Sequence, residues 1–218
     1  MMTLLHGYWR SGTSYRLRIA MNFKGLDYDQ LPVNLKDGDQ RGAAYKALNP
    51  QGLVPLLEID GVRLIQSPAI LEYLEETHPE PPLLPGTPAE RARIRAYAAV
   101  IGCDIHPIQN LRILQYLRTA YEQDSDGVTA WCQRWIGDGF AALEKMAEAD
   151  NRSGPYLWGG LPTMADVYLV PQMYNARRFG LALDAFPRLV AADEAAQAHP
   201  AFEAARPENQ PDTPEDER

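Results

Sequence analysis

The residues best suited to carry chemistry stand close to the front of the chain, in the stretch YWRSGTSYRLRIA from Tyr8 to Ala20. It sets three hydroxyl side chains among three arginines: Ser11, Thr13, Ser14, Arg10, Arg16 and Arg18. A short apolar run precedes it and helical spacing follows it, so residues 11–13 fall between a strand and the N-terminus of a helix. The unbonded N–H groups and the dipole at such a terminus favour negative charge. The stretch therefore predicts either a helix cap with solvated charges or a site that holds an anion.

A thiolate is one anion that such a site suits. The helix terminus and a donating hydroxyl from Ser11 or Thr13 lower the pKa of a thiol from its free value of about 8.5. The two cysteines of the chain, Cys103 and Cys132, are far apart and form no CxxC motif. Their spacing argues against a disulfide framework, a cysteine metal site and a dithiol redox enzyme, and we expect both to be buried bystanders in helices.

Two proline-containing segments are candidates for contacts to a ligand. In GLVP, the residue before Pro55 is held extended, and the bond between them can be cis, so Val54 is placed to offer its backbone N–H and C=O to an extended peptide. In QSP, Ser67 and the start of the helix that follows can bind a carboxylate. Each segment also has a structural interpretation, as an edge-strand proline and as a helix cap.

The second half of the chain offers two groups of polar residues. HPIQNLRIL brings together His106, Asn110 and Arg112, although the first two share a helix face only if the helix continues through the intervening proline. Arg177 and Arg178 stand near the end of an apolar helix, where cations also suit the helix dipole. Both groups are compatible with a ligand site and with solvated charges.

The elements that position these residues change in kind near residue 85. Before it, the sequence predicts a strand, a helix, a weaker strand, a hairpin of two strands and a helix: 3–8, 14–24, 28–34, 53–66 and from 67. Asp60-Gly61 is the dipeptide preferred in a tight antiparallel hairpin. This order predicts a mixed sheet covered by helices, which is closed by the proline-rich linker HPEPPLLPGTP.

From residue 87 on, the sequence predicts helices only. Capping boxes at Thr87–Glu90 and Thr163–Asp166 begin two of them, and we assign the second box wholly to structure. The first of these helices is expected to end near His106, with a further helical segment over 108–121. The tail from Pro207 is proline-rich and acidic, which predicts disorder. The expected parts are an α/β domain, an all-helical domain and a disordered acidic tail: 1–84, 87–206 and 207–218.

The composition limits the classes of protein to which the chain can belong. Of its 218 residues, 45% are hydrophobic and 23% charged, as in soluble globular proteins. The formal net charge of −8 disfavours nucleic acid as a partner, so positive charge for an anionic ligand must be gathered locally. No apolar run approaches the ~18 residues of a membrane span. Residues 1–10 lack the apolar core of a signal peptide, and we expect a cytoplasmic protein with no membrane partner.

Five segments together resemble the glutathione transferase superfamily, and in particular its zeta class. They stand in the family's order between about Thr3 and Ala205: RSGTSYRLRIA, LNPQGLVPLLEIDG, IQSPAILEYLEE, TMADVYLVPQ and NARRFG. The resemblance implies a thioredoxin-like α/β N-terminal domain, an all-α C-terminal domain, glutathione as the cofactor and a homodimer as the usual assembly. Zeta-class members include glutathione-dependent maleylacetoacetate isomerases.

One departure from that pattern bears on the substrate. Maleylacetoacetate isomerases usually read Ser-Ser-Cys-Ser where this chain has Ser11-Gly12-Thr13-Ser14. RSGTS together with GCDIHPIQN is more similar to the bacterial maleylpyruvate isomerases of gentisate breakdown. The resemblance therefore implies conversion of maleylpyruvate, a small dicarboxylate, to fumarylpyruvate by reversible addition of a bound thiolate to the cis double bond. Maleylacetoacetate isomerisation, a general zeta-class transferase activity and non-catalytic glutathione binding stay as alternatives.

The resemblance also assigns roles to individual residues. Glutathione is expected near eight of them: Ser11, Thr13, Val54, Gln66, Ser67, His106, Asn110 and Arg112. Of these, Val54 is implied to pair with the cysteinyl backbone, and Gln66 and Ser67 to hold the γ-glutamyl end. The carboxylates of the substrate need cations, for which the planar guanidinium of arginine is well suited. The expected substrate-binding residues are Arg10, Arg112 and Arg178, with Arg178 favoured over Arg177. The expected catalytic set is Ser11, Thr13, Arg10 and Arg178, with no metal.

Overall fold

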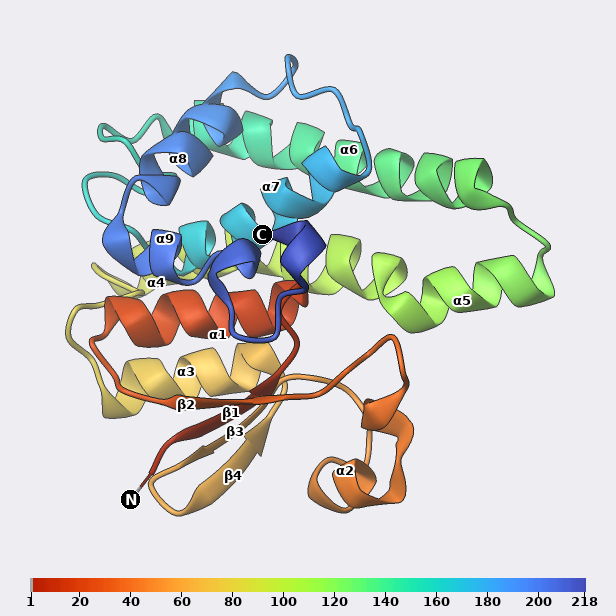
Figure 1. Ribbon diagram of the computed structural model, residues 1–218. Helices are drawn as coiled ribbons and strands as arrows, with labels where there is room; N and C mark the ends of the chain where they lie inside the picture. Colours follow the sequence, from red (N-terminus) through yellow and green to blue (C-terminus); the bar gives the residue numbers. More distant parts are fainter. Residues whose placement is uncertain (1) are drawn as a thin grey trace. The chain divides into compact units, whose positions relative to one another are not determined.

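The computed structural model describes residues 2–218, which form two compact units. The N-terminal unit combines Met1–Leu83 with Ala198–Arg218, and the helical unit is Leu84–Gln197. The first boundary lies within the proline-rich linker that the sequence marks. The second lies at Ala198, because residues 198–218, here called the C-terminal segment, belong to the same compact unit as the α/β part; Figure 1 draws them in dark blue.

The N-terminal unit is built on a mixed four-stranded sheet with the strand order β2-β1-β3-β4. β1 (Leu4–Gly7) pairs in parallel with β2 (Asp29–Pro32). β3 (Leu56–Ile59) pairs antiparallel with β1 and with β4 (Val62–Ile65), and the tight turn of this hairpin is the predicted Asp60-Gly61. Both turn residues have a positive φ, 52° and 79°, which explains why this dipeptide is found there. The sheet is the one that the sequence predicts.

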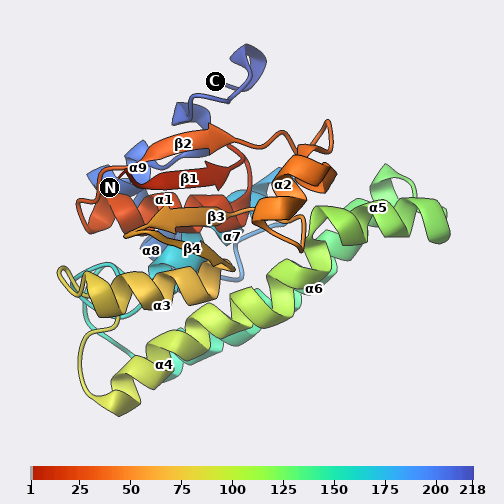
Figure 2. The same cartoon turned by 90° about the horizontal axis from the view of Figure 1, so that it is seen from below.

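Two helices cover one face of this sheet, α1 (Gly12–Phe23) and α3 (Ser67–Thr77), as Figures 1 and 2 show. The short α2 (Ala43–Leu48) precedes β3 in the chain. The βαβ–ββα order with helices on the sheet is the thioredoxin-like arrangement that was expected. Its consequence for the site is that the chain passes directly from the end of β1 into the N-terminus of α1.

α1 is deeply buried although it carries two arginines. It contacts α3 and also α9 (Pro200–Ala204), which belongs to the C-terminal segment. The guanidinium of Arg18, 1% exposed, is bonded to backbone oxygens: Nη2 donates to Trp9 at 2.8 Å and Nε to Ala205 at 3.0 Å. Burial lowers the pKa of Arg18 to about 10, so the group stays protonated at neutral pH.

The prediction of disorder from residue 207 is wrong. The C-terminal segment continues through two short 3-10 turns, η4 (Pro207–Asn209) and η5 (Glu215–Glu217), and buries Gln210 and Thr213. The Gln30 amide donates to Gln210 Oε1 at 2.8 Å, and the Thr213 hydroxyl donates to the carbonyl of Pro207. Composition alone cannot predict such order, because the partner of Gln210 comes from the front of the chain.

The helical unit contains the following elements: α4 (Pro88–Ala99), η2 (Val100–Ile105), η3 (His106–Gln109), α5 (Leu111–Ala120), α6 (Ser125–Asp150), α7 (Met164–Arg178) and α8 (Pro187–Gln197). The helix expected to end near His106 stops being α-helical at Ala99. A π-helical turn follows, and then a 3-10 turn that contains Pro107. Pro107 has no N–H to continue the α-helical pattern. Asn110 is extended, which separates η3 from α5.

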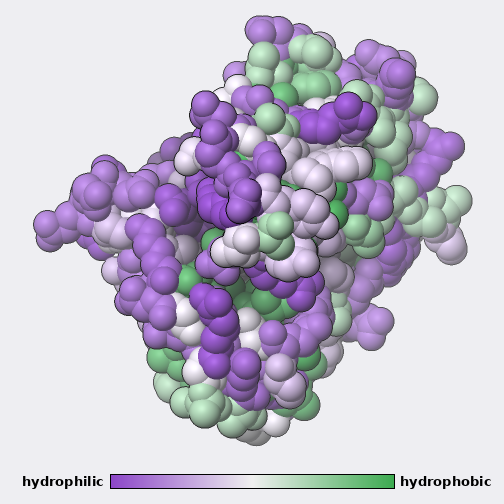
Figure 3. Space-filling model, turned by 90° about the vertical axis from the view of Figure 1, so that its right-hand side faces the viewer, coloured by the Kyte–Doolittle hydropathy of each residue, from purple (hydrophilic) through white to green (hydrophobic). Residues whose placement is uncertain are grey.

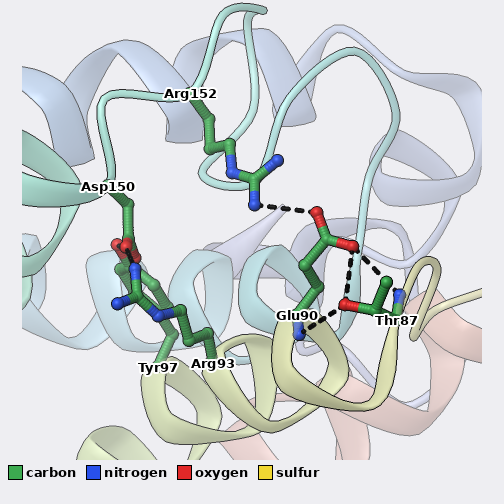
Figure 4. A network of polar contacts seen from close by, with 6 residues as sticks. All are labelled: Thr87, Glu90, Arg93, Tyr97, Asp150 and Arg152. Atoms are coloured by element: carbon green, nitrogen blue, oxygen red, sulfur yellow. Dashed lines mark hydrogen bonds and ion pairs between the residues drawn. The ribbon is translucent and has the colours of Figure 1, made fainter.

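Both predicted capping boxes of this unit are present. At the start of α4, the N–H and hydroxyl of Thr87 donate to Glu90 at 2.9 and 3.0 Å (Figure 4). Arg152 donates to the other carboxylate oxygen of Glu90 at 2.9 Å. At the start of α7, the fully buried Asp166 accepts from the N–H and hydroxyl of Thr163. The purely structural assignment of the second box is therefore supported.

The surface is in keeping with the composition. The face drawn in Figure 3 is mainly hydrophilic, with hydrophobic residues in smaller, scattered areas. Within residues 2–218, every helix is too short or too polar to cross a lipid bilayer.

Candidate active site

The site begins at the turn between β1 and α1. The N–H of Ser11 donates to the carbonyl of Tyr8 at 2.9 Å, which closes a four-residue turn with Trp9 and Arg10 at its centre. Ser11 is then the N-cap of α1, since its hydroxyl oxygen accepts from the N–H of Ser14 at 3.3 Å. Ser11 therefore caps α1 and lies at its N-terminus, as the sequence predicts.

The hydroxyls of Ser11 and Thr13 are bonded to each other, with 2.9 Å between the oxygens. The Thr13 hydroxyl also donates to the carbonyl of Val54 at 3.1 Å. A hydroxyl has a single hydrogen to donate, so Thr13 accepts from Ser11. The structure therefore brings together the three residues Ser11, Thr13 and Val54, which the sequence expectation placed in one site. The Ser11 hydrogen is the one that can turn towards a bound anion without breaking the link to Val54.

Val54 offers one backbone group to a ligand rather than the two that were expected. Its carbonyl is already taken by Thr13, whereas its N–H makes no hydrogen bond among the described residues. The Val54-Pro55 bond is cis. The preceding carbonyl, that of Leu53, accepts from the Tyr45 hydroxyl at 2.8 Å and from the Asn49 amide at 2.7 Å, which fixes the loop.

The start of α3 differs from the expectation that Ser67 caps it. The N-cap is Gln66, whose side chain makes no capping bond, and Ser67 is the first helical residue. Its hydroxyl is buried and accepts from Arg16 Nη1 at 3.4 Å. The N-terminus of α3 is therefore left without a side-chain cap, as an anion site requires.

Gln66 is the strained residue of the site. Its φ of 71° with ψ of 110° is a conformation that residues with a side chain rarely adopt. Such strain costs about 1–3 kcal/mol and is concentrated at functional positions. The Gln66 amide donates to Gln51 Oε1, which joins the loop before β3 to the start of α3. Gln51 could not be predicted from the sequence, because an exposed glutamine has no distinctive spacing.

Arg10 does not project freely from its turn. Its guanidinium lies 4.8 Å from the centre of the Trp9 ring and forms an ion pair of 3.1 Å with Glu217. The Arg10 side chain is 20% exposed. Glu217 belongs to the tail whose composition predicts disorder, so this partner could not be foreseen.

In the helical unit, His106 and Asn110 do not share the face of an α-helix. His106 begins the 3-10 turn, and Asn110 caps α5 by accepting from the N–H of Arg112 at 3.2 Å. The Arg112 side chain is exposed on the first turn of α5. His106 and Asn110 nevertheless lie on the short connection between η2 and α5, and Arg112 follows in the first turn of α5.

The two arginines at the end of α7 have different surroundings. Arg177 forms an ion pair of 2.6 Å with Asp193 of α8, whose side chain is fully buried. Arg178 lies with its guanidinium 5.0 Å from the centre of the Phe179 ring. Arg177 is thus engaged by a buried carboxylate, and the assignment of Arg178 to the substrate stays a prediction.

The chain's own thiols stay outside the candidate chemistry. Burial raises the pKa of Cys132 to about 11, partly opposed by Arg178 and Arg118, so this thiol is neutral at pH 7. Cys103 is exposed, which corrects the expectation that it is buried. Among residues 2–218, no three His, Cys, Asp or Glu side chains are grouped as metal ligands.

Known proteins are similar to this chain over nearly its whole length. Residues 10–77 match the family described as "Glutathione S-transferase, N-terminal domain". The maleylacetoacetate isomerase of Pseudomonas aeruginosa is 53% identical over 213 residues, which cover 96% of this chain and 98% of that protein. The maleylpyruvate isomerase of a Ralstonia species is 50% identical over 209 residues, which cover 96% of this chain and 99% of that protein.

Solved structures are similar as well. The holo structure of a maleylpyruvate isomerase, described as a bacterial zeta-class glutathione transferase, has a TM-score of 0.95 and 50% identity, covering 97% of this chain and 100% of that one. A maleylacetoacetate isomerase from Anaeromyxobacter dehalogenans 2CP-1, with GSH bound in its active site, has a TM-score of 0.87 and 44% identity, covering 98% of both chains. The chain therefore belongs to the glutathione transferase family, and its similarity is to the zeta class.

Proposed function

We propose that the protein is a glutathione-dependent cis–trans isomerase that converts maleylpyruvate to fumarylpyruvate. The observation that carries the proposal is the bonded pair of hydroxyls, Ser11 and Thr13, at the N-terminus of α1 beside the open N–H of Val54. A cysteinyl backbone paired with that N–H would direct its sulfur towards the helix terminus. The 50% identity to a maleylpyruvate isomerase supports the choice of substrate.

Glutathione, when bound, supplies a thiolate that adds reversibly to the cis double bond of the substrate and so allows rotation about it. The role of Ser11 is to donate a hydrogen bond from its hydroxyl to the sulfur, and for this the hydroxyl turns away from Thr13. Thr13 keeps its bond to Val54 and so keeps the loop and the helix terminus together. The α1 N-terminus adds its partial positive charge, which favours the thiolate over the thiol.

The γ-glutamyl end of glutathione is assigned to the start of α3. The uncapped N–H groups of that helix, the Ser67 hydroxyl and the Gln66–Gln51 pair present donors and acceptors for its carboxylate and amine. From the helical unit we assign His106, Asn110 and Arg112 to the same ligand. Asn110 uses its side-chain oxygen to cap α5, which leaves its amide hydrogens as the donors for this task.

The substrate is a dianion with a keto group, and its binding is assigned to arginines. Arg10 and Arg178 are proposed to bind the carboxylates and to stabilise the negative charge that develops on the keto oxygen. Arg112 is proposed to contribute from the first turn of α5. Each of these side chains can offer two parallel N–H donors to one carboxylate, which lysine cannot do.

The test follows the absorbance of maleylpyruvate with the purified protein, with and without glutathione, and of maleylacetoacetate in parallel. Glutathione-dependent isomerisation with maleylpyruvate preferred is the expected result. Maleylacetoacetate is the second candidate substrate, because the relative from Pseudomonas aeruginosa is 53% identical. One extra methylene is worth only about 1–3 kcal/mol of discrimination, so we expect both to be turned over to some extent. Glutathione binding without any turnover would contradict the proposal.

The assembly and location are part of the same proposal. We assign the protein to the cytoplasm as a homodimer, in keeping with the family resemblance. Light scattering on the eluted peak should give twice the chain mass of 24.4 kDa. Cell fractionation should place the protein in the soluble fraction, and a monomer or a membrane-bound pool would contradict these two assignments.

A further inference from the structure

Both backbone polar groups of Trp9 are held by residues that lie elsewhere in the sequence. Its N–H donates to Asp212 Oδ2 at 2.9 Å, and its C=O accepts from Arg18 Nη2 at 2.8 Å. Arg18 also donates to the carbonyl of Ala205 in the C-terminal segment. The backbone of Trp9 is therefore held by hydrogen bonds to α1, through Arg18, and to the C-terminal segment, through Asp212.

Trp9 occupies the turn that positions the candidate catalytic groups. It is the first of the two central residues of the Tyr8–Ser11 turn, and Arg10 is the second. The Trp9 side chain is 1% exposed, and the Arg10 guanidinium rests against its ring. A shift of the Trp9 peptide would thus move Arg10 and the hydroxyl of Ser11 together.

Asp212 is presented to Trp9 by an ordered turn of its own. The N–H of Thr213 donates to the carbonyl of Gln210 at 3.1 Å, which places Asp212 at the centre of a second four-residue turn. Gln210 and Thr213, at the two ends of this turn, are 3% and 4% exposed. The backbone at Asp212 is therefore held by this turn, and the hydrogen bond joins the central residues of two turns.

We propose that Asp212 is a positioning residue for the isomerase reaction, which holds the Trp9 N–H and thereby keeps Arg10 and Ser11 in their working positions. The inference rests on the proposed function and deepens it. It makes the C-terminal segment part of the framework of the active site. Asp212 acts through Trp9 and contacts neither the substrate nor the thiol in this role.

The test compares Asp212→Ala with Asp212→Asn in the full-length protein. Asparagine keeps an oxygen that can accept from the Trp9 N–H, whereas alanine does not. A hydrogen bond to a charged acceptor corresponds to roughly one to two powers of ten in an equilibrium constant. We expect Asp212→Ala to lower kcat/KM for maleylpyruvate about tenfold, with a higher KM because Arg10 binds the substrate and a lower kcat because Ser11 and Arg10 stabilise the charges of the reaction. Asp212→Asn should stay within about twofold of the wild type.

Asp216→Ala is the matched control, because Asp216 lies in the same segment, is exposed and has no hydrogen bond or ion pair within the described chain. It should leave kcat/KM unchanged. Amide hydrogen exchange at Trp9 gives a readout that does not depend on turnover. The exchange should become about tenfold faster in Asp212→Ala and stay slow in Asp212→Asn. If Asp212→Ala does not fold, Asp212→Ser, whose shorter hydroxyl cannot reach Trp9, replaces it.

Three results would overturn the inference. Asp212→Ala could keep the kcat/KM of the wild type, or lose activity only in proportion to its unfolded fraction. Asp212→Asn could be as impaired as Asp212→Ala, which would assign the effect to the charge and not to the hydrogen bond. A wild-type protein without isomerase activity is a different outcome, because it would refute the proposed function itself.

Discussion

The Thr13 hydroxyl donates to the carbonyl of Val54, 41 residues further along the chain, and in doing so orients the hydroxyl of Ser11. Thr13 can give its hydrogen only once, so Ser11 donates to Thr13 in the absence of a ligand. Two consecutive hydrogen bonds thus connect Ser11 at the N-terminus of α1, through Thr13, to the loop before β3. Two hydroxyls that look equivalent in the sequence therefore have different tasks.

Ser11→Ala should lower kcat about 10²–10³-fold, the range observed when a single donor to a developing anion is removed. The pKa of the bound glutathione thiol should rise, which a titration of the ultraviolet absorbance of the thiolate measures. Ser11 also caps α1, so the same change costs about 1 kcal/mol of stability.

Ser11→Gly separates these two effects. Glycine is a good N-cap and costs only a few tenths of a kcal/mol, yet it has no hydroxyl. Ser11→Gly should therefore be nearly as stable as the wild type and as inactive as Ser11→Ala. Recovery of activity in Ser11→Gly would mean that the serine serves only the helix.

Much of the fold follows from local signals in the sequence. The hairpin around Asp60-Gly61 and the two capping boxes depend on residues within a few positions of one another, and all three were predicted. The C-terminal segment was not, since its order depends on Trp9, Arg18 and Gln30. A proline-rich acidic composition predicts how an isolated segment behaves, but it does not reveal contacts with residues nearly 200 positions away.

The candidate site was predictable to a similar degree. Ser11, Thr13 and Val54 were expected together, and the structure joins them by hydrogen bonds. The place of Ser67 was misjudged by one position, because the strained backbone of Gln66 before it has no sequence signature. Asp212 was missed altogether, as its contribution is a contact to a backbone N–H, which any residue except proline could provide.

Substitutions at Gln66 test whether its backbone conformation is strained and whether its side chain contributes to glutathione binding. Gln66→Gly should be more stable than Gln66→Ala by about 1–2 kcal/mol, because glycine adopts a φ of 71° without steric cost. Both variants lose the side chain that bonds Gln51, so KM for glutathione should rise by a similar factor in each. Urea unfolding and initial rates measure the two quantities. Equal stabilities would show that the backbone at Gln66 is not strained.

Arg177 and Arg178 should respond to substitution in opposite ways. Arg178→Ala should lower kcat/KM for maleylpyruvate about 10²-fold, because Arg178 is assigned to the substrate. We expect a smaller change in stability than for Arg177→Ala, since Arg178 is exposed. Arg177→Ala leaves the buried carboxylate of Asp193 without its cation and should destabilise the fold. We expect about 2 kcal/mol, less than the 3–5 kcal/mol of a fully buried pair, since Arg177 is partly exposed.

Adding Asp193→Asn to Arg177→Ala should restore part of the lost stability, because the uncompensated charge is then removed. The kcat/KM of Arg177→Ala, measured per folded molecule, should match the wild type. A large loss of kcat/KM in Arg177→Ala and none in Arg178→Ala would reverse the assignment of the two arginines.

The capping box of α4 predicts a specific pH dependence of stability. The backbone N–H of Thr87, together with Arg152 and the Thr87 hydroxyl, lowers the pKa of Glu90 from 4.5 to about 2 (Figure 4). Because the folded-state pKa is the lower one, the unfolded chain binds the proton more readily between these values. The contribution of Glu90 is thus complete above pH 4.5 and is lost as the pH falls from 4.5 to 2.

Glu90→Gln removes this contribution at every pH. The free energy of unfolding in urea should therefore be lower for Glu90→Gln than for the wild type at pH 7, and the difference should shrink steadily below pH 4.5. Glu148→Gln is the matched control, since Glu148 is an exposed glutamate of the same unit, on α6. Its difference from the wild type should stay small from pH 7 to pH 3. A Glu90→Gln difference that is independent of pH would mean that the carboxylate charge does not stabilise the start of α4.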